Sequence, residues 1–340
     1  MKNQRKKYRA KGCVTLVALM LACLGMAACG KEKDPILEVQ PIVIKESEAA
    51  KTASQGKEQK GTSASFSENE ASDGSEDAYE SAGAAGSSYQ IIEDAGETLE
   101  TRVLPPAGYE RASVEEGSFE EFLRQYPMKP AGSKVHLYDG SEKGIQTDHA
   151  AVFALPMEEY DLQQCADSVM RMYAEYFWAT EQYDRIQFHF TSGFLAEYSK
   201  WRDGYRVTVN GNNVSWIKSK SKDTSYDCFV RYLKTIFCYA GTLSMEKESE
   251  PTLLSLLKAG DVFLYGGSPG HVVMVVDECV NAEGKKAFLL AQGYMPAQEF
   301  HLLKNDRHLD DPWYYEEEIK FPFSTPEYTF QEGSMRSLKY

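Results

Sequence analysis

The chain has too few basic residues to bind nucleic acid through its phosphates. Its 340 residues include 37 Lys and Arg against 51 Asp and Glu, which gives a formal net charge of −14. Phosphate recognition needs a basic face, so we exclude nucleic acid as a partner. The chain also lacks a phosphate-binding loop, an HExxH motif and a GxSxG motif. We expect no cofactor, and the length suggests one or two domains.

Aromatic residues are scarce between Cys29 and Ile91, where only Phe66, Tyr79 and Tyr89 occur. This segment is rich in Glu, Ser, Ala, Gly and Lys, so it buries too little apolar surface to offset the entropy of ordering it. We therefore predict a disordered acidic tether over residues 29–100 and a single folded domain over residues 101–340.

The apolar run near the N-terminus, Val14 to Met26, is too short for a comfortable permanent membrane span. It follows six basic residues and ends in Met-Ala-Ala-Cys. This pattern resembles a bacterial lipoprotein signal, with a signal peptide over residues 1–28 and a lipid on Cys29. The alternative is a plain secretory signal cut after Ala28. Either way we expect export, and the lipoprotein pattern implies lipid anchoring to a bacterial membrane in the cell envelope.

Two apolar segments joined by a glycine-rich turn organise the C-terminal half. Asp261–Tyr265 and Val272–Val276 are predicted strands, and the turn between them is Gly-Gly-Ser-Pro-Gly. His271 is the first residue after this turn. We expect it at the rim of a sheet, where it serves either as a catalytic base or as a hydrogen-bonding group that holds the loop.

Other segments complete an α+β pattern of helices followed by antiparallel strands. Helices are predicted at Ser118–Tyr126, Asp161–Trp178, Phe194–Trp201 and Thr224–Ala240, the last ending in a left-handed cap at Gly241. Further strands are predicted at Val135–Tyr138, Ala150–Leu155, Ile186–Thr191, Tyr205–Val209, Val214–Lys218, Ala287–Gln292 and Phe300–Leu303.

Two cysteines near predicted helix N-termini, Cys165 and Cys228, are candidate nucleophiles. A helix N-terminus lowers a thiol pKa, and a nearby histidine can take the proton. Cys165 also lies on the apolar stripe of its helix, which favours a core role. Cys228 follows Asp227, whose charge raises a thiol pKa. Some of the cysteines after Cys29 would form disulfides in an exported protein, which would remove a nucleophile.

The region around Cys228 and His271 resembles the NlpC-type papain-like cysteine peptidases of bacterial cell walls. The similarity rests on Asp227-Cys228, on Gly260-Asp261-Val262-Phe263, on Gly270-His271-Val272 and on Gln292, in that order. The chain departs from the family after the cysteine, where Phe229 and Val230 replace a small residue and a glycine. The resemblance implies a papain-like core of helices packed on a small antiparallel sheet or half-barrel, with Gln292 as the polar third residue.

A longer stretch, from about Val103 to Phe330, resembles an uncharacterised bacterial family known as domain of unknown function 4846. The motifs that carry this similarity are VHLYDG at 135–140, DLQQCAD at 161–167, FTSGF at 190–194, YAGTLS at 239–244, GDVF, GHVVMVVD and LLAQGYMPAQEFH at 289–301. Cys165 belongs to this pattern, so the family favours Cys165 as nucleophile while order and spacing favour Cys228.

The leading hypothesis is a cysteine-dependent amide hydrolase that acts on cell-envelope peptides, with peptidoglycan stem peptides as the natural substrate. His271 would shuttle the proton, and Gln292 or His301 would orient its ring. This hypothesis predicts a sulfur of Cys165 or Cys228 within about 4 Å of a His271 ring nitrogen. The alternative is a non-catalytic envelope lipoprotein that binds glycan, peptide or another envelope protein.

Overall fold

The computed structural model describes residues 90–340. The predicted signal peptide, Cys29 and residues 29–89 of the predicted tether lie outside the described residues. The folded part begins before the predicted boundary at Thr101, because Ile92 pairs with Val103 and Leu99 is fully buried. No helix of residues 90–340 is long and apolar enough to cross a membrane.

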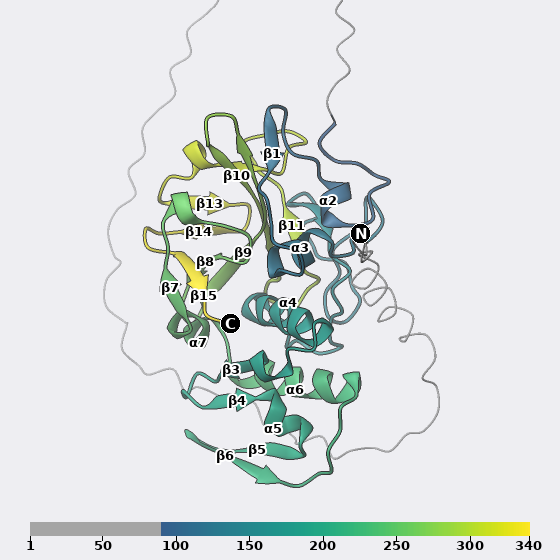
Figure 1. The fold of residues 1–340 in the computed structure, drawn as a ribbon, viewed down its shortest axis with the longest axis vertical. Coiled ribbons are helices and arrows are strands. Elements are labelled where there is room, and N and C mark those ends of the chain that lie inside the picture. The colour runs from purple at the N-terminus through teal and green to yellow at the C-terminus, as the bar shows by residue number, and fades with distance from the viewer. Residues whose placement is uncertain (1–89) are drawn as a thin grey trace, which may run out of the picture. The chain divides into compact units, whose positions relative to one another are not determined.

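A nine-stranded sheet forms the centre of the fold, in the order β2-β11-β10-β9-β8-β15-β7, with β1 paired to β9 and β12 paired to β10 (Figure 1). Its four central strands are antiparallel neighbours, as the sequence predicts: β8 (Val262–Tyr265), β9 (His271–Asn281), β10 (Lys286–Gln292) and β11 (His301–Leu303). The other strands are β1 (Tyr109–Arg111), β2 (His149–Val152), β7 (Ser249–Pro251), β12 (Tyr314–Tyr315) and β15 (Met335–Leu338).

This sheet is larger than the predicted small sheet or half-barrel. The sequence did not predict β1, β7, β12 and β15, and β9 runs five residues beyond its predicted end at Val276. The first part of β9 pairs with β8 and its last part pairs with β1. The mixed fold of helices on an antiparallel sheet agrees with the predicted α+β class.

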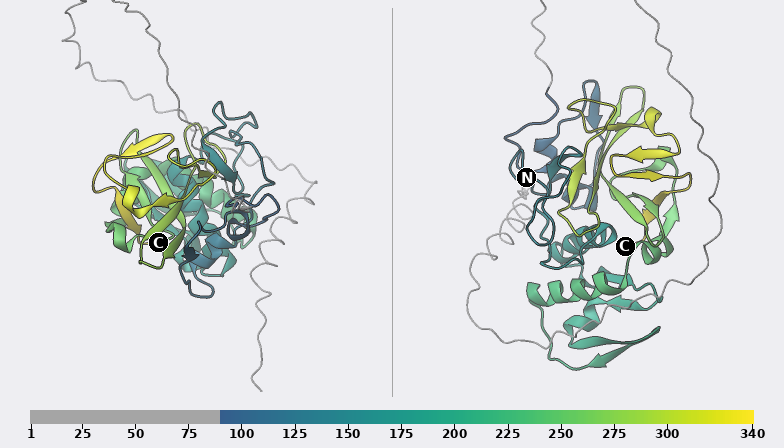
Figure 2. Two further views of the ribbon diagram at one scale, coloured as in Figure 1. Left: turned by 90° about the horizontal axis from the view of Figure 1, so that it is seen from above. Right: turned by 180° about the vertical axis from the view of Figure 1, so that it is seen from behind.

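The helices are α2 (Leu99–Arg102), α3 (Phe119–Arg124), α4 (Cys165–Ala179), α5 (Tyr198–Arg202), α6 (Tyr226–Tyr239) and α7 (Thr242–Lys247). Short 3₁₀ turns occur at Tyr183–Arg185, Leu254–Leu256 and Glu316–Glu318. Three separate hairpins pair β3 (Gln187–His189) with β4 (Leu195–Glu197), β5 (Tyr205–Asn210) with β6 (Asn213–Lys218), and β13 (Phe323–Thr325) with β14 (Tyr328–Phe330). Figures 1 and 2 show α4 between the central sheet and α6.

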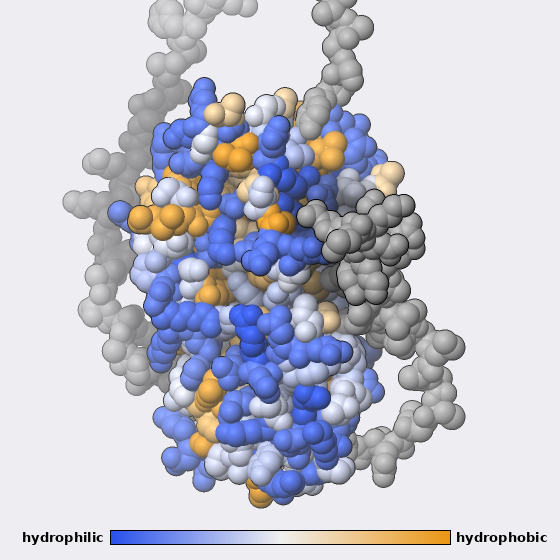
Figure 3. Space-filling view, viewed as in Figure 1, coloured by the Kyte–Doolittle hydropathy of each residue, from blue (hydrophilic) through white to orange (hydrophobic). Residues whose placement is uncertain are grey.

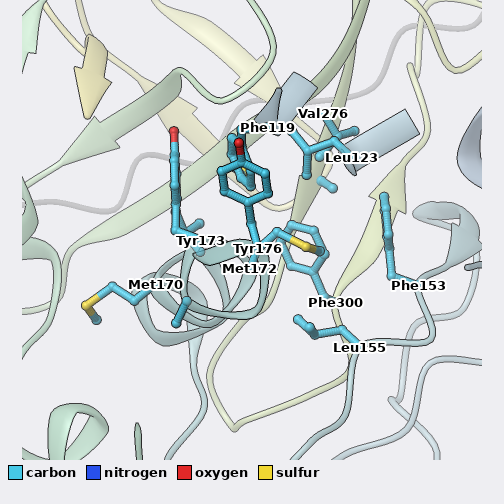
Figure 4. Close-up of a cluster of buried hydrophobic side chains, with 14 of the residues drawn as sticks. Phe119, Leu123, Phe153, Leu155, Met170, Met172, Tyr173, Tyr176, Val276 and Phe300 are labelled. Atoms are coloured by element: carbon cyan, nitrogen blue, oxygen red, sulfur yellow. The ribbon is translucent and has the colours of Figure 1, made fainter. Parts of the chain in front are cut away.

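The central helix α4 is buried on nearly all sides, which fixes its position against the sheet. Its aromatic side chains pack with those of α3, and the rings of Phe119 and Tyr173 stack with centroids 4.0 Å apart (Figure 4). Phe153 and Phe300 join the same core, with centroids 5.1 Å apart. Each fully buried side chain of this size contributes on the order of 1.5–3 kcal/mol through removal of apolar surface from water. In Figure 3 the visible face is mainly hydrophilic, with apolar side chains in small separate groups.

The start of α4 corrects the predicted helix at Asp161, because the helix begins four residues later, at Cys165. Asp161 Oδ1 accepts a hydrogen bond from the Ala297 backbone N–H at 2.7 Å, so this carboxylate bonds to a loop instead of starting the helix. Asp167 Oδ2 instead accepts from the Gln164 N–H at 3.0 Å, next to the helix start. Cys165 is therefore the first helical residue.

Other local predictions differ in outcome. Ser225 caps α6, and the predicted strands Tyr205–Val209 and Val214–Lys218 are confirmed and pair as a hairpin. The left-handed cap at Gly241 is wrong, since Gly241 has an extended φ of 166° and precedes the unpredicted helix α7. Two wrong predictions concern short segments: Val135–Tyr138 makes only isolated bridges, and Phe194–Trp201 divides into β4 and α5.

A buried ion cluster joins the N-terminal segments of the domain to the sheet. Asp277 on β9 is fully buried and accepts from Arg111 Nε at 2.7 Å and from Arg124 Nε at 2.6 Å. Removing one member of such a cluster leaves a buried charge without compensation.

We expect Asp277→Ala to lower the free energy of unfolding by about 3–5 kcal/mol, because two arginines lose the carboxylate with which they pair. Glu142→Ala removes the exposed pair with Lys134 and should cost about 0–1 kcal/mol. Denaturant unfolding of both variants measures the difference. Equal and small effects would show that the cluster is not needed for stability.

Candidate functional site

His271 lies at the end of the sheet and hydrogen-bonds to Gln292. The distance from His271 Nε2 to Gln292 Oε1 is 2.7 Å, and both side chains are buried. Gly270, the residue before His271, has no room for a side chain, since a Cβ there would lie 2.2 Å from Thr242 Oγ1. The predicted pairing of His271 with Gln292 is thus present in the structure.

Glu327 determines the orientation of the Gln292 amide. Gln292 Nε2 lies 2.7 Å from Glu327 Oε2, which also accepts from Lys143 Nζ at 2.7 Å. Burial opposes ionisation of Glu327, but the nearby His301 ring and the hydrogen bond from Lys143 outweigh it and lower its pKa to about 2. An ionised carboxylate only accepts, so the amide nitrogen must face Glu327 and the amide oxygen must face His271.

This orientation fixes the tautomer of His271. Because Gln292 Oε1 accepts, His271 Nε2 carries the proton, and Nδ1 is left with a lone pair. Nδ1 is then the nitrogen that can take a proton from a neighbouring group. No sequence pattern identifies Glu327 or Lys143, because neither lies in a recognised motif or near His271 in the chain.

Cys165 reaches the same end of the sheet from α4. The backbone N–H of Val272, the residue after His271, lies close enough to the Cys165 sulfur to lower the thiol pKa, although burial outweighs it. Burial chiefly, and also the nearby Cys165 thiol, raise the pKa values of Tyr294 and Tyr328. The rings of these two tyrosines flank His271, with centroids 4.9 Å and 4.8 Å from the imidazole. Cys165 and His271 therefore share one group of neighbours.

Cys228 lies in a different environment. It is fully buried on α6, and the charged groups that act on its thiol are Asp223, Arg206 and Arg231, none of which contacts the His271 group. Of the two candidate nucleophiles, the structure brings Cys165 to the histidine. The cysteines at 165, 228, 238 and 279 are all free thiols, so no disulfide occupies either candidate.

His301, the alternative orienting residue, does not bond to His271. Its Nδ1–H donates to the Glu299 carbonyl at 2.8 Å, and its Nε2 lies 3.7 Å from Glu327 Oε2. It pairs with Gln292 across β10 and β11. Of the two candidate orienting residues, only Gln292 hydrogen-bonds to the His271 imidazole.

Both candidate catalytic groups are uncharged at neutral pH in this state. Burial lowers the pKa of His271 to about 4, although the Gln292 hydrogen bond and Glu327 oppose the shift. Burial and then the charge of Asp167 raise the pKa of the Cys165 thiol to about 11. The resting pair is therefore a thiol beside a neutral imidazole.

A cavity of about 300 Å³ opens next to Cys165. Its walls come from the N-terminus of α4, the turn before α7 and the turn before His271. Among residues 90–340, no group of three or more His, Cys, Asp or Glu side chains is arranged to hold a metal ion. The cavity thus offers one nucleophilic sulfur and a histidine nearby, an arrangement suited to acyl transfer.

The chain matches the family described as "Domain of unknown function (4846)" over residues 99–337. It belongs to this family. The matched range includes Cys165, His271, Gln292 and Glu327, and the family description names no activity. No curated protein and no solved structure matches the chain.

We expect the His271 imidazole to remain the neutral Nε2–H tautomer down to a pH of about 4. A histidine whose folded pKa is lowered contributes stability that is present above its ordinary pKa and is lost as the pH falls towards the folded pKa. Nitrogen NMR of the ring measures both properties, and His271→Gln identifies the signal. A midpoint near the ordinary histidine value, or an Nδ1–H tautomer, would contradict the assigned hydrogen bond to Gln292.

Proposed function

We propose that this protein is a cysteine-dependent amide hydrolase with a papain-like catalytic arrangement, in which Cys165 is the nucleophile, His271 the base and Gln292 the orienting group. The observation that carries the proposal is the position of the Cys165 sulfur, close enough to the Val272 N–H for it to lower the thiol pKa, at the same end of the sheet as an imidazole whose Nε2 is held by Gln292. The nucleophile, base and orienter come from α4, β9 and β10.

Each residue has a defined part in the proposed reaction. The Cys165 thiol gives its proton to His271 Nδ1, and the sulfur attacks the carbonyl carbon of an amide. His271 then gives the proton to the leaving amine as the C–N bond breaks, and water cleaves the thioester with His271 as base. The N-terminus of α4 and the Val272 N–H favour the thiolate, because both present positive dipole ends to the sulfur.

The proposed substrates are peptides of the bacterial cell envelope, including peptidoglycan stem peptides. Support comes from the N-terminal sequence, which predicts export and a lipid on Cys29, and from the similarity to NlpC-type peptidases. A lipid anchor would hold the domain close to envelope peptides.

A non-catalytic binding protein is the rival proposal, and one observation favours it. Cys165 and His271 are only 6 % and 3 % exposed, and burial shifts both pKa values away from an ion pair. The same cavity would then bind glycan, peptide or another envelope protein without cleaving it.

We expect Cys165→Ala and His271→Ala to lower the rate of peptide hydrolysis by at least about a hundredfold, because each removes a reacting group. Cys228→Ala is the matched control and should retain the rate, since Cys228 lies away from His271. The assay is release of new amines from purified peptidoglycan stem peptides.

Two results would contradict the hydrolase. One is equal hydrolysis by wild type and Cys165→Ala. The other is binding of stem peptides by wild type with no new amine released, which would establish the rival proposal instead.

For the anchor, we expect Cys29→Ala to move the protein from the membrane fraction to the soluble exported fraction, because a thioether-linked lipid needs this sulfur. Mass spectrometry of the mature wild-type N-terminus should show an acylated cysteine. An unmodified N-terminus after cleavage would support the plain secretory signal.

A further inference from the structure

The cavity beside Cys165 is acidic. Two carboxylates, Asp161 and Asp167, line it, and none of its lining residues is Lys, Arg or His. Its other walls include the apolar side chains of Leu162, Leu243 and Met295. A small site with two carboxyl groups and short apolar walls favours a cationic group on a short aliphatic stem.

Asp167 has an oxygen that no protein group satisfies. Its side chain is 5 % exposed, and its Oδ2 accepts from the Gln164 N–H at 3.0 Å. Its Oδ1 is buried without a hydrogen-bond partner among residues 90–340. Asp161, in contrast, uses Oδ1 to accept from the Ala297 N–H and from the Gln164 amide.

The sequence spacing suggests a partner for Asp167, but the structure gives that partner to other groups. Arg171, one turn further along α4, donates to Glu158 and Gln163 at 2.8 Å and 2.7 Å and pairs with Glu175. Asp167 therefore has no ion pair with Arg171, although the two residues lie four apart on α4. The lack of a cation agrees with the effect of burial, which raises the pKa of Asp167 to about 8.

A buried carboxylate oxygen with no partner costs free energy, and such groups in native proteins call for an explanation. We propose that Asp167 receives the primary ammonium group of a ligand bound in the cavity beside Cys165. This inference rests on the proposed function to the extent that the ligand is a peptide, whose amine would then select the substrates of Cys165.

Binding of an ammonium group would also affect the nucleophile once Asp167 is ionised. Burial and then the charge of Asp167 raise the pKa of Cys165, and Asp167 carries this charge above a pH of about 8. In that pH range a bound cation offsets the charge and so favours the thiolate.

The test uses n-butylammonium and its uncharged analogue 1-butanol as probes of the wild-type protein, with binding measured by ligand-observed NMR at constant ionic strength. We expect saturable binding of n-butylammonium and at least about tenfold weaker binding of 1-butanol. The comparison needs no variant, so it is independent of any folding defect. Equal binding of the two probes, or no saturable binding of n-butylammonium, would overturn the proposal.

Asp167→Asn keeps the size of the side chain and removes the charge, and it should weaken n-butylammonium binding by at least about tenfold. Asp184→Asn is the control of equal charge change, because Asp184 lines a different cavity. Thermal unfolding checks that both variants fold. Undiminished binding by folded Asp167→Asn would overturn the proposal. Amine binding without peptide hydrolysis would reject the hydrolase alone, and hydrolysis without amine binding would reject this inference alone.

Discussion

The candidate site depends on the close contact between the N-terminus of α4 and the ends of β9 and β10. Gly293 follows β10, and a Cβ there would lie 2.5 Å from Ser168 Oγ and 3.0 Å from the Gln164 carbonyl. Any larger residue would push the helix away from the sheet. The helix could then no longer bring Cys165 to the Val272 N–H. One glycine therefore determines the distance between the proposed nucleophile and the proposed base.

The second constraint is the chain of hydrogen bonds behind the imidazole. Lys143 holds Glu327, Glu327 orients the Gln292 amide, and Gln292 fixes the proton on His271 Nε2. These residues come from a loop, a hairpin turn and two strands, so tertiary packing alone assembles the chain. Its effect is local, because it decides which ring nitrogen has the free lone pair.

The sequence predicts the parts of this arrangement that depend on short-range pattern. The apolar run after Gly270 and the run ending at Gln292 identify the strands, and hence His271 and Gln292. The choice between Cys165 and Cys228 depends on where each helix begins and on which helix contacts the sheet. The start of α4 depends on the hydrogen bond between Asp161 and Ala297, which lie more than a hundred residues apart. The spacing of apolar residues in the sequence does not reveal such a contact. Glu327 is beyond sequence prediction for the same reason.

The protonation states of Cys165 and His271 determine the free-energy cost of forming the reactive thiolate. The pKa values of Cys165 and His271 differ by about seven units, so transferring the proton costs on the order of 10 kcal/mol before the two charges attract each other. Two charges about 4 Å apart near a protein surface regain about 4 kcal/mol. The remaining several kcal/mol are a large part of the barrier of roughly 13–17 kcal/mol that ordinary turnover rates allow. A productive site therefore needs a ligand that lowers this cost. Above a pH of about 8, where Asp167 is ionised, a cation at Asp167 would do so, because after burial the charge of Asp167 is the cause that raises the Cys165 pKa.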